Sequence, residues 1–131
     1  MRMMIEPTAA YCAAKFATEE QLSKIKVASH EIEKSILEGR SRLKSEQDFH
    51  NAIAEASQNP FVKELMPIIN RAIHSVVTTF DKNPDLLTLS MNDHRELVRF
   101  LETRNADGAY AAMRLHIVHA FEISRIELDM P

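Results

Sequence analysis

The chain has 131 residues, 45% of them hydrophobic, which is enough apolar mass for one domain with a core of its own. Its formal net charge is −3 with acids and bases interspersed, which excludes the basic stripe of a chain that binds nucleic acid by itself. The single cysteine, Cys12, excludes an internal disulfide, and no segment has the composition of a membrane span or a signal peptide. A soluble cytoplasmic domain is predicted.

The composition predicts an all-α fold. Only two glycines and no tryptophan occur, alanine and leucine are abundant, and no stretch alternates apolar and polar residues with the period of a strand. We expect a single domain over residues 1–131, folded as an antiparallel bundle of about six helices, with seven as the alternative.

The first two helices have clear local signals. The first covers about residues 4–16, and its four alanines form a small-residue face suited to close packing. Thr18 is predicted to cap the second helix, because acidic residues follow it and Gln21 can complete a capping box. This helix is expected to run to Glu38, with Gly39 as its stop. Its apolar stripe consists of Leu22, Ile25, Ser29, Ile32 and Ile36.

The third and fourth helices meet at a second capping signal. Asn59 is predicted as the N-cap of the fourth helix and Pro60 as its first residue. Within that helix, Pro67 predicts a kink or the end of a first short segment. The inward-facing residues expected for the third helix are Leu43, Glu46, His50, Ile53, Ala54 and Ser57.

Residues 81–85 have the composition of a loop. Ser90 is predicted to cap the fifth helix, with Asp93 three residues later and an apolar face after it. The sixth helix is predicted to start at Asp107 and Gly108. Its inward-facing positions are expected to be Ala109, Ala112, Met113, His116, Ala120 and Ile123.

Three histidines and one glutamate fall on the inward sides of these helices. Glu46 and His50 are four residues apart, so their side chains are neighbours and can chelate one ion. His94 and His116 lie on the apolar faces of the fifth and sixth helices. Imidazole with carboxylate suits Zn²⁺, Ni²⁺, Fe²⁺, Co²⁺ or Mn²⁺. We predict a divalent metal in the bundle interior, with open coordination positions for water or a small organic acid.

Two other interpretations stay open. The histidines can be hydrogen-bonded core residues of a metal-free interaction or dimerisation module. A metal-dependent enzyme is less favoured, because we find no spare inward-facing acid that would serve as a base for hydrolysis. His74 and His119 border apolar faces, where they complete the core or contact a bound effector; we favour the core. His30 and Asp48 are expected to point away from the site.

Several stretches together resemble one known family. They are Arg2–Pro7 followed by alanines, the run Phe49–Pro60 with the sequence FHNAIAEASQNP, Asp93-His94-Arg95, and then Asp107, Ala111-Ala112-Met113 and His116. The chain resembles, over nearly all its length, the C-terminal effector-binding domain of FadR-type regulators in the GntR family of bacterial transcription regulators. This domain is called the FCD domain.

The resemblance implies a ligand set. Metal-containing members place an acid one turn before a first histidine and two more histidines on later helices, which corresponds to Glu46, His50, His94 and His116. The acid in the family is usually aspartate, so Glu46 is a departure, and its longer side chain would reach the ion with another rotamer or denticity. The resemblance also implies that Arg2 reads the carboxylate of the effector.

The resemblance further implies a role in regulation. Such regulators are commonly dimers and begin with a winged helix-turn-helix domain that binds DNA. No such domain occurs in this chain, which starts where the effector domain is expected to start. We therefore expect an excised domain or a truncated product, whose bound organic acid would alter DNA binding by the missing domain.

Overall fold

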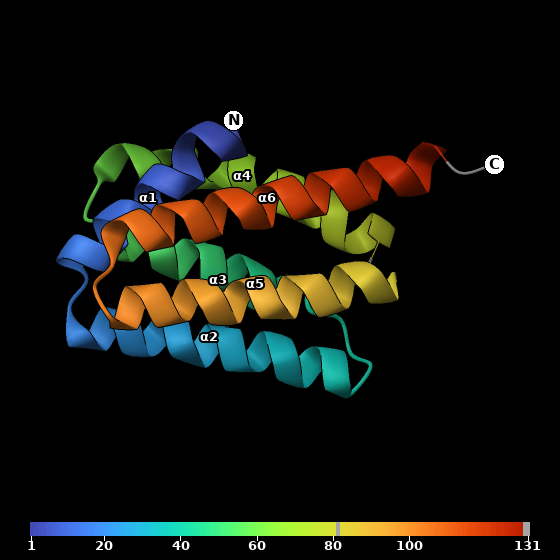
Figure 1. Ribbon diagram of the computed structural model, residues 1–131, viewed down its shortest axis with the longest axis horizontal. Helices are drawn as coiled ribbons and strands as arrows, with labels where there is room; N and C mark the ends of the chain where they lie inside the picture. Colours follow the sequence, from blue (N-terminus) through green and yellow to red (C-terminus); the bar gives the residue numbers. More distant parts are fainter. Residues whose placement is uncertain (81, 130–131) are drawn as a thin grey trace.

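The computed structural model of the chain describes the backbone of residues 1–80 and 82–129, and the side chains of this part up to Glu122. Within this part the chain forms helices and no strand, which confirms the predicted all-α class (Figure 1). The helices are α1 (Arg2–Phe16), α2 (Glu19–Leu37), α3 (Leu43–Ala56), α4 (Pro60–Phe80), α5 (Pro84–Glu102) and α6 (Ala106–Asp129).

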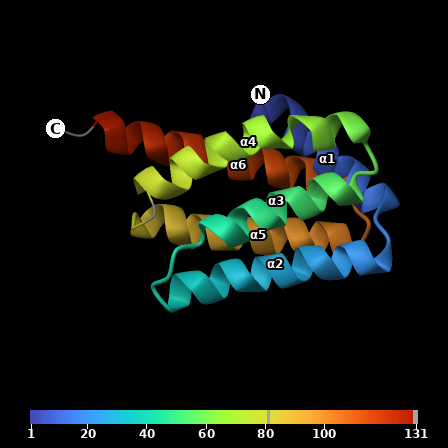
Figure 2. The ribbon, with the colours of Figure 1, turned by 180° about the vertical axis from the view of Figure 1, so that it is seen from behind.

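Helix α3 contacts three other helices, while one of its sides stays exposed. It packs against α1, α2 and α4, while α6 packs against α1 and α5. Figures 1 and 2 show these helices as a bundle of nearly aligned rods in which α2 and α3, and likewise α5 and α6, run in opposite directions. Because α3 has neighbours on several sides, side chains on its inner face can meet residues from helices that are far away in the sequence.

The alanine face of α1 is used as predicted. Ala10, Ala13 and Ala14 are fully buried, and α1 makes its most extensive contact with α6, where Ala109 is buried as well. Small residues at a helix contact let two backbones approach closely. The first turns of α1 are thereby held against the middle of α6, next to His116.

The predicted N-caps are confirmed at two helix starts. The Thr18 hydroxyl accepts a hydrogen bond from the Gln21 backbone N–H at 3.1 Å, and the Gln21 side chain accepts one from the Thr18 backbone N–H at 3.0 Å. The Asn59 side chain accepts a hydrogen bond from the Phe61 backbone N–H at 2.9 Å. Gly39 follows α2 with φ of 68°, a conformation that favours glycine.

The predicted start of the fifth helix was wrong. Helix α5 begins at Pro84, and the Asn83 side chain accepts a hydrogen bond from the Leu86 backbone N–H at 3.1 Å. Ser90 is a buried residue inside the helix and does not cap it. The physical reason is the Asn-Pro pair, whose cap and preset φ start α5 as the same pair starts α4.

Helix α4 runs without interruption through Pro67, so the alternative in which this proline ends a first short segment was wrong. Its buried line of Val62, Met66, Ile69 and Ile73 continues on both sides of the proline. Burial of that line against the bundle offsets the hydrogen bond that proline removes. The described residues therefore form six helices, and the alternative of seven was wrong.

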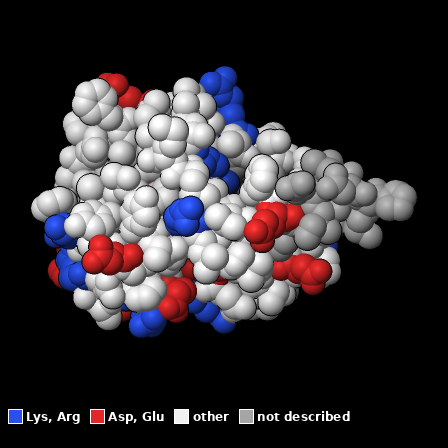
Figure 3. Space-filling model, turned by 45° about the horizontal axis from the view of Figure 1, so that its top comes forward, with Lys and Arg blue, Asp and Glu red and all other residues white. Residues whose placement is uncertain are grey.

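The inward positions predicted for α6 are buried up to Ala120, and Ile123 lies outside the described side chains. None of the helices, as far as they are described, is long and apolar enough to cross a membrane. On the face shown in Figure 3 the basic and acidic side chains are scattered among uncharged ones, with no continuous basic stripe.

Candidate metal and effector site

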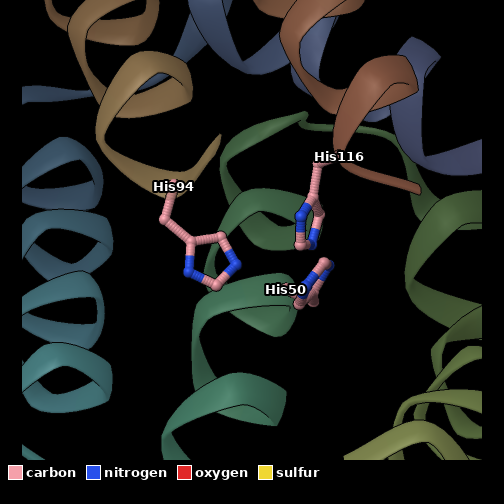
Figure 4. Close-up of side chains that lie close together, drawn as sticks. All are labelled: His50, His94 and His116. Atoms are coloured by element: carbon pink, nitrogen blue, oxygen red, sulfur yellow. The ribbon is translucent and has the colours of Figure 1, made fainter. Parts of the chain in front are cut away.

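Three histidine rings meet at the centre of the bundle (Figure 4). His50 comes from α3, His94 from α5 and His116 from α6, and each is at most 5% exposed. One ring nitrogen from each lies within 4.8 Å of the others. Three separate helices thus bring potential metal ligands to a single point.

Three ring nitrogens of this cluster lack hydrogen-bond partners among the described residues. Among the described residues, neither nitrogen of His94 has a partner, nor does Nδ1 of His116, which lies 3.5 Å from Asp93 Oδ2. That separation is too long for a good hydrogen bond. Buried polar atoms without partners are costly, and a metal ion would supply the missing partner. The residues therefore fit a metal.

Glu46 lies beside the histidines, as the helix spacing predicts. Its Oε2 is 3.5 Å from Nε2 of His94 and 3.9 Å from Nε2 of His50. Its Oε1 accepts a hydrogen bond from Nη1 of Arg42 at 3.0 Å. Burial raises the pKa of Glu46, but the charges of His94 and Arg42 outweigh burial and bring it below the usual value. Glu46 is thus an ionised carboxylate, the form that binds metals.

Glu6 is a buried acid that the sequence analysis missed. Its carboxylate accepts a hydrogen bond from Nδ1–H of His50 and another from Nε of Arg2 at 2.5 Å. Burial raises the pKa of Glu6, but His50 and Arg2 oppose this effect and hold the pKa at about 2. A carboxylate on one ring nitrogen orients the other toward a metal, so Glu6 leaves Nε2 of His50 free to coordinate.

A sequence signal for Glu6 was present. Ala9, Ala10 and Ala13 follow Glu6 at offsets of three, four and seven, so it belongs to the alanine face that was expected to be buried. Glu6 is a further inward-facing acid, so the prediction that no spare acid faces inward was wrong.

Asp93 is a second carboxylate at the edge of the cluster. Nδ1 of His119 lies 2.9 Å from its Oδ2, and Nδ1 of His116 lies near the same oxygen. Burial raises the pKa of Asp93, but its interactions with the nearby His116 and His119 rings outweigh burial and lower it. Asp93 was predicted as part of a helix cap; in the structure it lies inside α5 and faces α6. His119 is half-buried and is directed to Asp93.

The remaining predicted residues lie outside the cluster. His74 is exposed, so the expectation that it completes the core was wrong, and it does not border the cavity beside the cluster. On α4, Ile73 and Val77 form the buried line, which turns His74 outward. His30 and Asp48 are exposed, as predicted.

A small cavity of about 20 Å³ adjoins the cluster. Its polar lining comes from Arg2, Arg42, Glu46, His50 and His116, and α4 supplies an apolar wall. Arg2, Val76 and Ala120 also border a larger surface groove of about 620 Å³. Arg42 was missed by the sequence analysis, although it precedes Glu46 by four residues, which is the spacing of a helical ion pair.

We expect the metal-free domain to lose stability as the pH falls below about 6.5. Burial lowers the pKa of folded His94 to about 3, whereas an unfolded histidine titrates near 6.5. Between these values the unfolded chain binds more protons, so stability falls with pH, by up to about 1.4 kcal/mol per pH unit for this group. Burial also lowers the pKa of His116, which adds to the effect in the same direction.

Denaturant titrations between pH 7 and 4.5 would test this expectation, with His94→Leu giving a flatter profile than the wild type. Glu6 does not interfere in this window, because its lowered pKa means that its contribution is lost only between pH 4.5 and about 2. Equal slopes for the two proteins would mean that folded His94 takes up a proton.

Comparison with known families identifies the family of the domain. The FCD domain family matches residues 1–119. The chain belongs to the FCD domain family. A solved structure from Streptococcus agalactiae, described as GntR, aligns with a TM-score of 0.79 and 28% identity. It covers 90% of this chain, which spans 53% of that one.

Two curated relatives of this FCD domain are transcription regulators. The Uxu operon regulator of Haemophilus influenzae is 25% identical over 96% of this chain and 51% of its own length. The HTH-type transcriptional regulator LutR of Bacillus subtilis is 26% identical over 94% of this chain and 58% of its own. The chain thus spans slightly more than half the length of these relatives. It is an FCD domain of GntR-family regulators, a family with an effector-binding role, and its relatives are regulators and not enzymes.

Proposed function

We propose that this FCD domain senses a small organic acid through a divalent metal ion held by His50, His94, His116 and Glu46. One observation carries the proposal: buried imidazole nitrogens from three helices face one another, and those of His94 lack any hydrogen-bond partner among the described residues. The match to a family of regulator domains supports a sensing role for such a site.

The donor set favours a borderline ion such as Zn²⁺, Ni²⁺, Fe²⁺, Co²⁺ or Mn²⁺. His50 would bind through Nε2, because Glu6 accepts the hydrogen bond from its Nδ1. Glu46 would bind through Oε2, because Arg42 holds its other oxygen. When bound, the ion supplies a positive centre to which a carboxylate can coordinate, and Arg2 at the edge of the same cavity would read that carboxylate.

The size of the cavity supports a sensing mechanism. A space of about 20 Å³ holds roughly one water molecule, so an organic acid cannot enter without movement of the surrounding wall. The apolar wall on α4 is formed by Ile73, Val76 and Val77, whose aliphatic side chains cannot hydrogen-bond to the cluster. An acid that binds only after this wall moves has a higher affinity for the opened arrangement of the domain than for the closed one. A sensor requires such a difference in affinity.

In the complete regulator, the arrangement would be read by a winged helix-turn-helix domain outside these 131 residues. LutR is described as HTH-type, and both curated relatives are nearly twice as long as the segment they share with this chain. We propose that the regulator is a cytoplasmic homodimer, that this domain binds no nucleic acid on its own, and that the acid shifts the DNA-binding domains between two arrangements.

Metal analysis of the purified chain tests the proposal. We expect close to one ion per chain, lost on treatment with a chelator and regained with Zn²⁺ or Ni²⁺. Hydroxy acids and dicarboxylic acids are then expected to raise the melting temperature of the loaded form only. If no ion binds even after addition of metal, the proposal fails, and the three histidines belong to a metal-free interaction module.

A further inference from the structure

Arg42 is a buried cation with unused hydrogen-bond donors. Only 4% of its side chain is exposed, and Nη1 donates to Oε1 of Glu46 at 3.0 Å. Its Nε and Nη2 are buried and have no partner among the described residues. The same side chain lines the cavity beside the histidine cluster.

The two unused nitrogens of Arg42 form a geometric pair. Nε–H and the adjacent Nη2–H point in the same direction and are parallel, so together they form a fork that matches the two oxygens of a carboxylate. Because a buried, charged donor without a partner is costly, such a fork needs an acceptor. The pairing with Glu46 uses Nη1 and does not need the fork. The fork is therefore suited to binding an oxyanion such as a carboxylate.

The charges of the site, together with a bound divalent ion, favour an anionic ligand. Arg2 pairs with Glu6 and Arg42 pairs with Glu46, so these four charges cancel. Asp93 at the edge of the cluster adds one further negative charge. A divalent ion would add two positive charges in a space of low polarity, where uncompensated charge is costly. Asp93 would offset part of that charge, and a carboxylate at the ion would offset the rest. The fork of Arg42 is a second place for a carboxylate, apart from the ion.

We propose that Arg42 binds a second carboxylate of the effector, so that the acid sensed by this domain is a dicarboxylate. This inference rests on the proposed metal-dependent sensing. One carboxylate lies at the metal and Arg2, and the other receives the hydrogen bonds of the Arg42 fork. Shifts of Arg2 and Val76, which border both the cavity and the 620 Å³ groove, join the two spaces and make room for the acid.

The competing role for Arg42 is purely structural. In that case Arg42 only holds Oε1 of Glu46, and its fork is satisfied by water, which the cavity has room for. The two roles differ in what a lysine would do at this position. A lysine keeps the positive charge beside Glu46 but has no planar fork for a carboxylate.

The test compares acids that differ only by the second carboxylate: malate with 2-hydroxybutyrate, succinate with butyrate, and glutarate with pentanoate. Each is titrated calorimetrically into the Zn²⁺-loaded wild type, Arg42→Lys and, as a matched control, Arg40→Lys. Arg40 is an exposed arginine of the same loop, paired with Glu38. Metal content and circular dichroism of every protein are recorded alongside.

We expect the wild type to prefer the diacid of at least one pair. Arg42→Lys should bind that diacid about 10- to 100-fold more weakly, the range for hydrogen bonds between charged groups, with the monoacid and the metal unaffected. Arg40→Lys should behave as the wild type does.

Three results overturn the inference. In the first, the loaded wild type binds both members of every pair equally or binds none of the acids. In the second, Arg42→Lys keeps the preference for the diacid. In the third, Arg42→Lys loses the metal, which shows that Arg42 acts through Glu46. Failure of the proposed function is distinguishable from these, because a wild type that holds no Zn²⁺ rejects the metal site itself.

Discussion

Replacing His94 with alanine is expected to abolish the stabilisation of the domain by metal. At a metal concentration about 1,000 times Kd, binding to the folded state stabilises the wild type by roughly 4 kcal/mol. For a domain of this size that corresponds to a rise of roughly 10 °C or more in the melting temperature. His94 is the histidine with both ring nitrogens unpaired, so no other contact in the described part of the chain substitutes for its coordination.

His30→Ala is the matched control for this measurement. His30 lies on the exposed side of α2, away from the cluster, so its loss should leave the metal-dependent rise in melting temperature intact. Thermal melts with and without Zn²⁺ or Ni²⁺ would be recorded for the three proteins. A full rise in the His94→Ala variant would contradict the proposed ligand set. A rise that is lost only in the His30→Ala variant would indicate binding at the surface of the domain.

Breaking the Arg42–Glu46 pair from either side is expected to destabilise the domain strongly. Both side chains are 4% exposed, so Arg42→Met leaves a buried carboxylate and Glu46→Leu leaves a buried guanidinium. Such uncompensated buried charges typically cost about 3–5 kcal/mol, a large part of the roughly 5–15 kcal/mol that holds a domain folded. The double variant removes both charges and should recover most of this loss.

Urea titrations of the metal-free single and double variants measure the coupling between the two residues. The exposed pair of Arg40 and Glu38 provides the comparison, and Arg40→Met should change stability by less than about 1 kcal/mol. Additive losses in the double variant of the buried pair would mean that the two charges do not compensate each other. They would also mean that Glu46 is held in place mainly by the histidines.

Buried polar groups connect several helices of the bundle in addition to their apolar packing. Arg2 and Glu6 on α1 connect to His50 on α3, and Asp93 on α5 connects to His116 and His119 on α6. An acid that binds at the cavity would therefore act on the contacts of α1, α3 and α6 at once. Under the proposed function, this connectivity is a physical route by which a small ligand would change the relative positions of the helices.

Local features of the sequence determined most of the helix boundaries. Two helices start at local signals, the capping box of Thr18 and Gln21 and the pair Asn59-Pro60. These signals can be recognised in the sequence because their hydrogen bonds join residues within four positions of each other. The miss at α5 had the same local basis: the pair Asn83-Pro84 was read as part of a loop. The pairing of Glu46 with His50 was predictable for the same reason, since a helix places residues four apart side by side.

Only the tertiary structure decided the surroundings of the cluster. The contact between Glu6 and His50 joins residues 44 positions apart, and no local rule states which face of α1 meets α3. His74 and His119 have similar positions beside apolar faces in the sequence, yet the first is exposed and the second binds Asp93. Burial of Arg42 likewise depends on how the ends of several helices close around it. Sequence periodicity identifies which residues face inward, whereas the packing of helices against one another determines which of them meet.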